Sequence, residues 1–161
     1  MIQIREATLD DISAIARVHV NADWETYSAL FGSRAYALGF GESELRWRRA
    51  LCGGDTLLVA GDGGDIVGLG HARGHWIGAL YVLRSHQRRG AGRALLWGLL
   101  AALNRQGIAE ARFDVVAANE NATAFYRAHG AHPVGRCINR DTRRDDEDLI
   151  FAIPTTPVTA P

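Results

Sequence analysis

The residues with the clearest potential chemistry are four arginines and two glycines, which fall within ten positions after an apolar segment. They are Arg84, Arg88, Arg89, Gly90, Gly92 and Arg93. A helical pattern begins at residue 90, and the first amides of a helix have no acceptor inside it. Glycine lets a ligand approach those amides closely, while the helix dipole and the guanidinium groups add positive potential. The run therefore predicts an anion site that suits a diphosphate.

The overall composition excludes several classes of protein. Of the 161 residues, 18 are basic and 18 are acidic, and every basic residue is an arginine. Without lysine, neither a lysine Schiff base nor a Walker-type phosphate loop can form. The zero net charge argues against nucleic acid as a partner. No apolar run reaches the ~18 residues of a membrane span, so no membrane partner is expected either.

The cysteines and histidines indicate neither disulfides nor a metal. Cys52 and Cys137 are too few and too far apart for a disulfide framework or a cysteine zinc site. His71 and His75 share a face of a predicted strand, but no third ligand is evident, so no metal is expected. These features predict a reduced, cytoplasmic protein.

The chain around the arginine run alternates patterns typical of strands and helices. Thr8 and Asp11 form a near capping box before the first helical pattern. Further helices are predicted loosely over 24–51 and at 90–104 and 119–129, and strands at 2–5, 57–60, 66–72, 76–83, 111–116, 134–139 and 148–153. This order predicts one α/β domain over residues 1–153, a mixed sheet with helices packed against it. Residues 154–161 are rich in Pro and Thr and are expected to form a flexible tail.

Two motifs, in this order, resemble those of the GCN5-related N-acetyltransferases, the GNAT superfamily. Gln87-Arg88-Arg89-Gly90-Ala91-Gly92 resembles the family's acyl-CoA signature, and it follows Ala79-Leu80-Tyr81-Val82, which is similar to the family's central strand. Residues 119–130 are similar to its Asn-x-x-Ala-x-x-Phe-Tyr-x-x-x-Gly helix. The resemblance runs from about residue 2 to residue 153. It implies a single domain with a mostly antiparallel sheet, whose central parallel strands, 76–82 and 111–116, splay apart.

The resemblance also implies an activity. An amine on a small molecule or a protein would attack acetyl-CoA directly in a ternary complex, and Tyr126 would protonate the leaving thiolate as general acid. The thioester oxygen would bond a backbone amide near Val82, and Asn119 would contact the cosubstrate or an ordered water. The residues that the resemblance assigns to acetyl-CoA are Leu80, Tyr81, Val82, Gln87, Arg88, Arg89, Gly90, Ala91, Gly92, Arg93, Asn119 and Tyr126.

The general base and the acceptor site are less closely defined. Many relatives place a glutamate on the central strand, but Trp76 and Gly78 stand there in this chain. His71, expected across the hairpin from Gly78, is the candidate base, directly or through water, and His75 is the second candidate. For each, a structural or exposed histidine is the alternative. Trp24 and Tyr27, in the aromatic-rich region, are the candidate acceptor-binding residues, with plain core packing as the alternative.

Two other functions remain open from the sequence. The missing strand carboxylate would suit a non-catalytic module that binds acyl-CoA as a sensor. A NAD(P)-binding domain is the other alternative, although Leu95 stands where the dinucleotide fingerprint requires Gly or Ala. The resemblance also raises a homodimer as an alternative to a monomer.

Overall fold

The computed structural model describes residues 1–139 and 146–156, and within them seven strands form one sheet in the order β1-β2-β3-β4-β5-β7-β6. All neighbouring strands are antiparallel except β4 and β5, which are parallel. The mixed, mostly antiparallel sheet that the sequence predicts is confirmed. The strands are β1 (Gln3–Glu6), β2 (Thr56–Asp62), β3 (Asp65–Arg73), β4 (Trp76–Val82), β5 (Glu110–Val116), β6 (His132–Asn139) and β7 (Asp146–Pro154).

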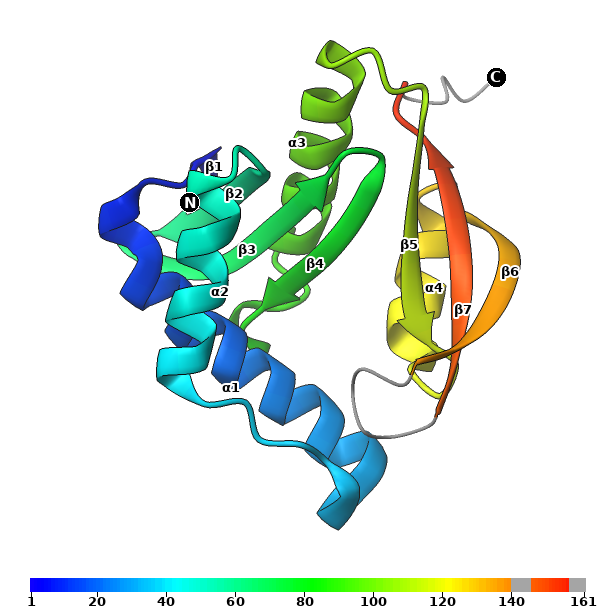
Figure 1. Ribbon diagram of the computed structural model, residues 1–161, viewed down its shortest axis with the longest axis horizontal. Coiled ribbons are helices and arrows are strands. Elements are labelled where there is room, and N and C mark those ends of the chain that lie inside the picture. The colour runs from blue at the N-terminus through cyan, green and yellow to red at the C-terminus, as the bar shows by residue number, and fades with distance from the viewer. Residues whose placement is uncertain (140–145, 157–161) are drawn as a thin grey trace.

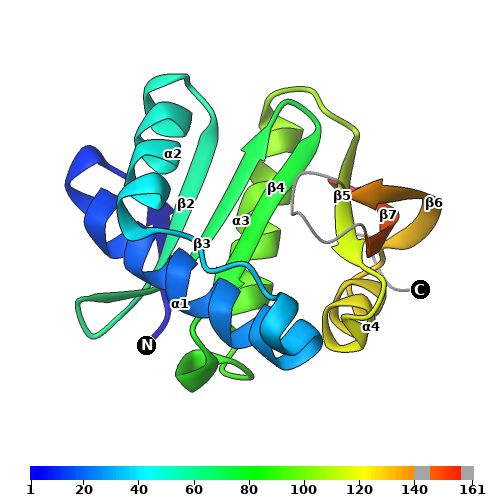
Figure 2. The ribbon, with the colours of Figure 1, turned by 60° about the horizontal axis from the view of Figure 1, so that its bottom comes forward.

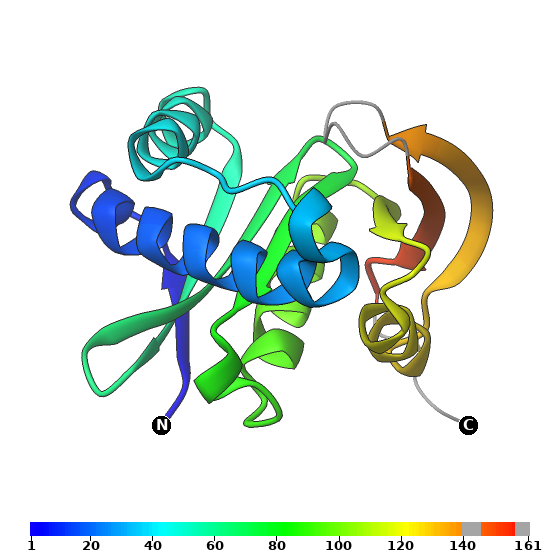
Figure 3. The same cartoon turned by 90° about the horizontal axis from the view of Figure 1, so that it is seen from below.

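Helices cover both faces of this sheet (Figures 2 and 3). They are α1 (Ile12–Phe31), α2 (Phe40–Cys52), α3 (Ala91–Arg105) and α4 (Glu120–Ala128), and short 3-10 turns occupy 9–11, 32–34 and 84–86. On the α1 and α2 face, Trp47 and Ile15 pack against Leu69 and its neighbours in β2. On the other face, a leucine stripe of α3 that includes Leu99 packs with Phe151. Each layer therefore buries its own apolar core, as an α/β layered domain requires.

The aromatic-rich region forms two separate helices rather than the loose single one predicted over 24–51. Helix α1 continues as far as Phe31, and α2 begins at Phe40. The break falls at Gly32, whose φ of 56° is readily adopted only by glycine. The two helices then pack side by side on one face of the sheet (Figure 1).

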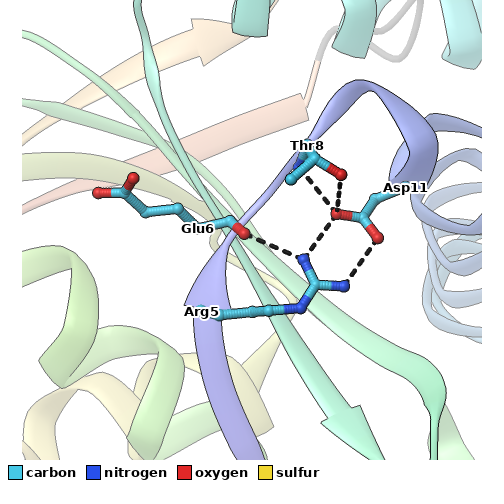
Figure 4. A network of polar contacts seen from close by, with 4 residues as sticks. All are labelled: Arg5, Glu6, Thr8 and Asp11. Carbon is cyan, nitrogen blue, oxygen red and sulfur yellow. Dashed lines mark hydrogen bonds and ion pairs between the residues drawn. The ribbon is translucent and has the colours of Figure 1, made fainter.

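The start of the first helix is stabilised by a polar network (Figure 4). The Asp11 carboxylate accepts hydrogen bonds from the backbone N–H of Thr8 at 2.8 Å and from its hydroxyl at 3.0 Å. Arg5 donates to both carboxylate oxygens, at 2.7 and 2.8 Å. The hydrogen bond with Arg5 is the main cause that holds the pKa of Asp11 far below its ordinary value. The capping role predicted for Thr8 and Asp11 is thus confirmed.

The folded domain extends further towards the C-terminus than residue 153. Strand β7 includes Pro154, and Thr155 is 2% exposed. The Thr155 hydroxyl donates to the carbonyl of Ile108 at 2.6 Å, and its backbone N–H donates to Ala109 at 3.0 Å. These bonds hold the strand end to the α3–β5 connection, so Pro154 and Thr155, expected in the tail, are part of the folded domain. Residues 140–145, between β6 and β7, and residues 157–161 lie outside the described residues.

The parallel strands β4 and β5 separate almost as soon as they meet (Figure 1). Their only register pair among the described residues is Trp76 with Arg112, where the Arg112 N–H donates to the carbonyl of His75 at 2.8 Å. The predicted splay is confirmed. Beyond Trp76, no strand of the described residues pairs with the edge of β4 that faces β5.

Candidate functional site

The start of α3 presents a series of free amides. Gly90 caps this helix with φ 89°, and Arg88 also has a left-handed φ of 61°. The first helical bond runs from Ala94 to the carbonyl of Gly90 at 2.9 Å. Within the described part of the chain, the backbone N–H groups of 88–93 donate to no protein acceptor. Six successive amides are thus available to an anion at the positive end of the helix dipole.

The side chains of this loop divide into two groups. Gln87 donates to the carbonyl of Val82 at 3.1 Å, which ties the loop to the end of β4. Arg89 forms an ion pair with Asp62 at 3.0 Å. The guanidinium groups of Arg88 and Arg93 make no ion pair with any described residue. These two arginines are therefore the ones free to meet an external anion.

The exposed edge of β4 offers backbone groups in a regular alternation. Leu83, just past the strand, donates its N–H to the carbonyl of Val67 in β3 at 3.0 Å. Successive residues of a strand direct their backbone groups to opposite edges. The N–H groups of Leu80 and Val82 therefore lie on the edge that faces β5, where an extended ligand can pair with the strand as an added strand would.

A pocket of about 520 Å³ opens where β4 and β5 part. Residues 77–81 of β4 and 113–116 of β5 form its walls, together with Asn119 and Tyr126. The C-terminal half of α1 and the segment that leads into α2 lie across this opening (Figure 2). From that side the polar and aromatic lining residues are His19, Asp23, Tyr27, Tyr36, Glu42 and Arg46.

Tyr126 reaches this pocket from α4. Its ring packs against Phe113 of β5 at 4.3 Å and against Phe125 at 5.1 Å between centroids. Burial raises the pKa of Tyr126 well above its ordinary value, and the electrostatic influence of Tyr27 and Asp114 raises it further. The phenol therefore keeps its proton at neutral pH and is able to donate a hydrogen bond or a proton.

Asn119 lies at the start of α4 and lines the same pocket. Its side-chain oxygen accepts the N–H of Ala122 at 3.1 Å, which caps the helix. The capping bond leaves the amide nitrogen of Asn119 to meet a ligand or water.

His71 lies beside the pocket but is not one of its lining residues. Its Nε2 donates to Asp55 at 2.8 Å, so the neutral ring carries its lone pair on Nδ1. That nitrogen is buried without a partner in the described residues and lies 2.8 Å from where a Cβ on Gly78 would stand. Burial lowers the pKa of His71, while the bond to Asp55 opposes that change. A side chain at 78 would collide with this ring, which explains why glycine occupies that position.

The two predicted acceptor residues have different surroundings. Tyr27 lines the pocket and stacks on Phe31 at 6.1 Å between ring centroids. Trp24 is 48% exposed and lies outside the lining residues.

Sequence reasoning did not assign His19, Arg46 or Asp114 to this pocket. Asp114 is an acidic residue of β5 that lies between the buried Phe113 and Val115, and this alternation was a usable signal. His19 and Arg46 reach the pocket only because α1 and α2 pack together, which no local pattern shows.

The described residues contain no group of three His, Cys, Asp or Glu side chains that could hold a metal ion. None of the described helices is long and apolar enough to cross a membrane.

Comparisons with known proteins agree with this geometry. A family model described as the acetyltransferase (GNAT) family matches residues 19–131. The uncharacterized N-acetyltransferase YuaI of Bacillus subtilis is 32% identical over 145 residues, which cover 83% of this chain and 82% of that protein.

Solved structures share the fold at lower sequence identity. The PaiA N-acetyltransferase of Thermoplasma acidophilum, in complex with coenzyme A, has a TM-score of 0.76 at 17% identity, covering 96% of this chain and 99% of its own. The ribosomal-protein-alanine N-acetyltransferase of Brucella melitensis has a TM-score of 0.77 at 20% identity, with coverages of 94% and 99%. YncA of Salmonella typhimurium, with its cofactor acetyl-CoA, reaches 0.77 at 17% identity, with coverages of 100% and 98%.

Proposed function

This chain belongs to the acetyltransferase (GNAT) family, and we propose that it transfers the acetyl group of acetyl-CoA to a primary amine held in the pocket between β4 and β5. Family membership makes the protein an acetyl-CoA-dependent acyltransferase. The ternary complex, the residues and their roles are our proposal. The observation that carries it is the single register pair between β4 and β5, because strands that part there open a slot beside Tyr126.

In this arrangement the start of α3 binds the diphosphate of acetyl-CoA. The six free amides of 88–93 and the unpaired side chains of Arg88 and Arg93 supply donors and charge. Arg89 supports the loop through its ion pair with Asp62. The pantetheine arm then lies along the free edge of β4, within reach of the backbone of Leu80 and Val82.

The reaction forms a C–N bond to the acetyl group and breaks its C–S bond. The neutral amine nitrogen attacks the thioester carbonyl, and an amide on the exposed edge of β4 near Val82 stabilises the oxyanion. The C–S bond of the tetrahedral intermediate then breaks, and the sulfur leaves as a thiolate. Tyr126 donates its phenolic proton, or a hydrogen bond, to that sulfur.

A carboxylate of the pocket is better placed than His71 to accept the proton that the amine loses. Asp114 lines the same pocket as Tyr126, and its charge contributes to the raised pKa of that phenol. The lone pair of His71 is buried behind Gly78 and would need a relay. We therefore propose Asp114 as the general base. The role of His71 as the base, which the sequence predicts, stays a prediction. A pocket that holds a carboxylate beside Tyr126 favours an enzyme over a non-catalytic sensor.

Turnover by a Tyr126→Phe variant tests the proposal. The phenyl ring retains the packing on Phe113, so the affinity for acetyl-CoA is expected to remain within about twofold of wild type. Without the proton donor, kcat for CoA release in an amine panel should fall by on the order of 10²-fold. Full turnover by this variant would contradict the role of Tyr126. Absence of CoA release by the wild type with every amine, despite tight acetyl-CoA binding, would support the sensor instead.

A further inference from the structure

Arg46 is a charged residue of the pocket that the transfer reaction does not use. It lies on α2, lines the pocket and makes no ion pair with any described residue. Its guanidinium lies over the ring of the buried Trp47, 4.9 Å from the centroid. Glu42, one helical turn earlier, instead accepts a hydrogen bond from Tyr36 at 3.2 Å. The guanidinium of Arg46 therefore lies in the pocket with no carboxylate of the described chain within ion-pair distance.

His19 adds a neutral donor to the same part of the pocket. Its Nδ1 accepts the indole N–H of Trp47 at 3.0 Å and lies 2.8 Å from the hydroxyl of Ser43. Because an indole nitrogen can only donate, the proton of the His19 ring is on Nε2. Burial, followed by the charge of Arg46, lowers the pKa of His19 to about 3, so the ring stays neutral.

The Nε2–H of His19 has no partner within the described residues, although the side chain is only 1% exposed. This nitrogen is not among the buried unpaired atoms of the described residues, so it is accessible from the pocket and can donate to a ligand or water there. Since His19 lines the pocket beside Tyr81, with ring centroids 4.9 Å apart, a bound acceptor can provide that partner. Arg46 and His19 together present a cation and a neutral N–H donor to one small space.

Carboxylates occupy other parts of the lining. Asp114 lies on β5 beside Tyr126, and Asp23 accepts the hydroxyl of Tyr81 at 3.2 Å. An ammonium group suits these carboxylates, whereas an anionic oxygen suits Arg46 and His19. The pocket is therefore complementary to a molecule that carries both charges.

We propose that the acceptor is a small amine that also carries a carboxylate, such as a free amino acid, and that Arg46 and His19 bind this carboxylate. This inference rests on the proposed function, because it places the amine of the same molecule at the acetyl group. Tyr27, Tyr36 and the apolar residue Leu38 line the space left for a side chain. Arg46 is thus a specificity residue that touches the acceptor and takes no part in proton transfer.

Matched ligands test the proposal by binding, independently of turnover. Phenylalanine, phenethylamine and phenylalaninamide, and the corresponding three forms of methionine, are titrated calorimetrically into the CoA-bound protein. In at least one series the free acid should bind about tenfold tighter than its amine or amide. In Arg46→Gln the acid of that series should lose about 10- to 150-fold in affinity, the value of a charge-assisted hydrogen bond, while the amine changes little. Arg48→Gln, on the same helix but outside the pocket lining, is the matched control and should bind as wild type.

Three outcomes would overturn the inference: equal binding of acid, amine and amide, no binding by any acid, or an acid-to-amine ratio that Arg46→Gln leaves unchanged. Stronger binding of the amide than of the acid would point to a peptide N-terminus as acceptor. If the wild type still binds CoA and turns over acetyl-CoA, each of these results leaves the proposed function intact. Failure of the wild type to bind CoA would refute the proposed function itself.

Discussion

Gly90 offers a sharp test of the anion site at the start of α3. Its φ of 89° is left-handed, and a Cβ built on it would meet nothing within 4 Å. Gly107, just past the other end of the same helix, has φ 81° and equally open space. Ala at either position would be destabilised by the same backbone strain, about 1–2 kcal/mol, because its Cβ disfavours a left-handed φ. Only Gly90, however, lies among the free amides.

The two variants should therefore have equal stability but different affinity for CoA. For a domain of this size, each kcal/mol lowers Tm by about 2–4 °C, so both should melt about 2–8 °C below wild type. Gly90→Ala also places a methyl group at the approach to the amides and displaces the loop. The loss of one charge-assisted bond to phosphate, about 1.5–3 kcal/mol, should weaken CoA binding about 10- to 150-fold.

Thermal melts and calorimetric titration of CoA into wild type, Gly90→Ala and Gly107→Ala provide the comparison. Gly107→Ala should bind CoA as wild type does. If Gly90→Ala binds CoA as tightly as Gly107→Ala, the diphosphate does not lie on these amides and our reasoning about α3 fails.

Three further outcomes are expected. Asp11→Asn should lose about 1–2 kcal/mol of unfolding free energy at pH 7. Because Arg5 depresses the folded pKa of Asp11, this difference should persist above the ordinary carboxyl pKa of about 3.9 and shrink on acidification, which urea unfolding at several pH values measures. Gly78→Ala should cost about 1–3 kcal/mol through its clash with His71, and little in a His71→Ala background, as a double-mutant cycle would show. Since the pKa of Tyr126 is raised, its deprotonation should cause no fall in kcat below pH of about 10; a fall that Tyr126→Phe abolishes would contradict this.

Local patterns predicted the elements that carry the proposed cosubstrate site. Gly90 marks the start of α3 because the chain needs a left-handed residue there. Asn119 begins α4 through its bond to Ala122, as its position before a helical pattern suggests. The end of α1 was harder to place, since apolar and aromatic residues continue past Gly32 and only its backbone conformation ends the helix.

The acceptor side could not be predicted from local patterns, because it depends on how distant segments pack. His19 and Trp47 are 28 residues apart and meet through one hydrogen bond. The surroundings of His71 depend on a β-bulge between His71 and Ala72, which shifts the register of β3 against β4. The register pairs His71 with Ala79, yet the ring lies against Gly78, the residue that the sequence expects opposite it. The hydrogen bond of the same ring to Asp55, 16 residues earlier, is the part that no local pattern shows.

A crystal structure with CoA bound would test the proposed site as a whole. We predict the diphosphate on the amides of 88–93, the pantetheine arm along the free edge of β4, and the sulfur within hydrogen-bond distance of the Tyr126 hydroxyl. A diphosphate bound elsewhere, or a sulfur far from Tyr126 with the space between β4 and β5 empty, would contradict the proposal.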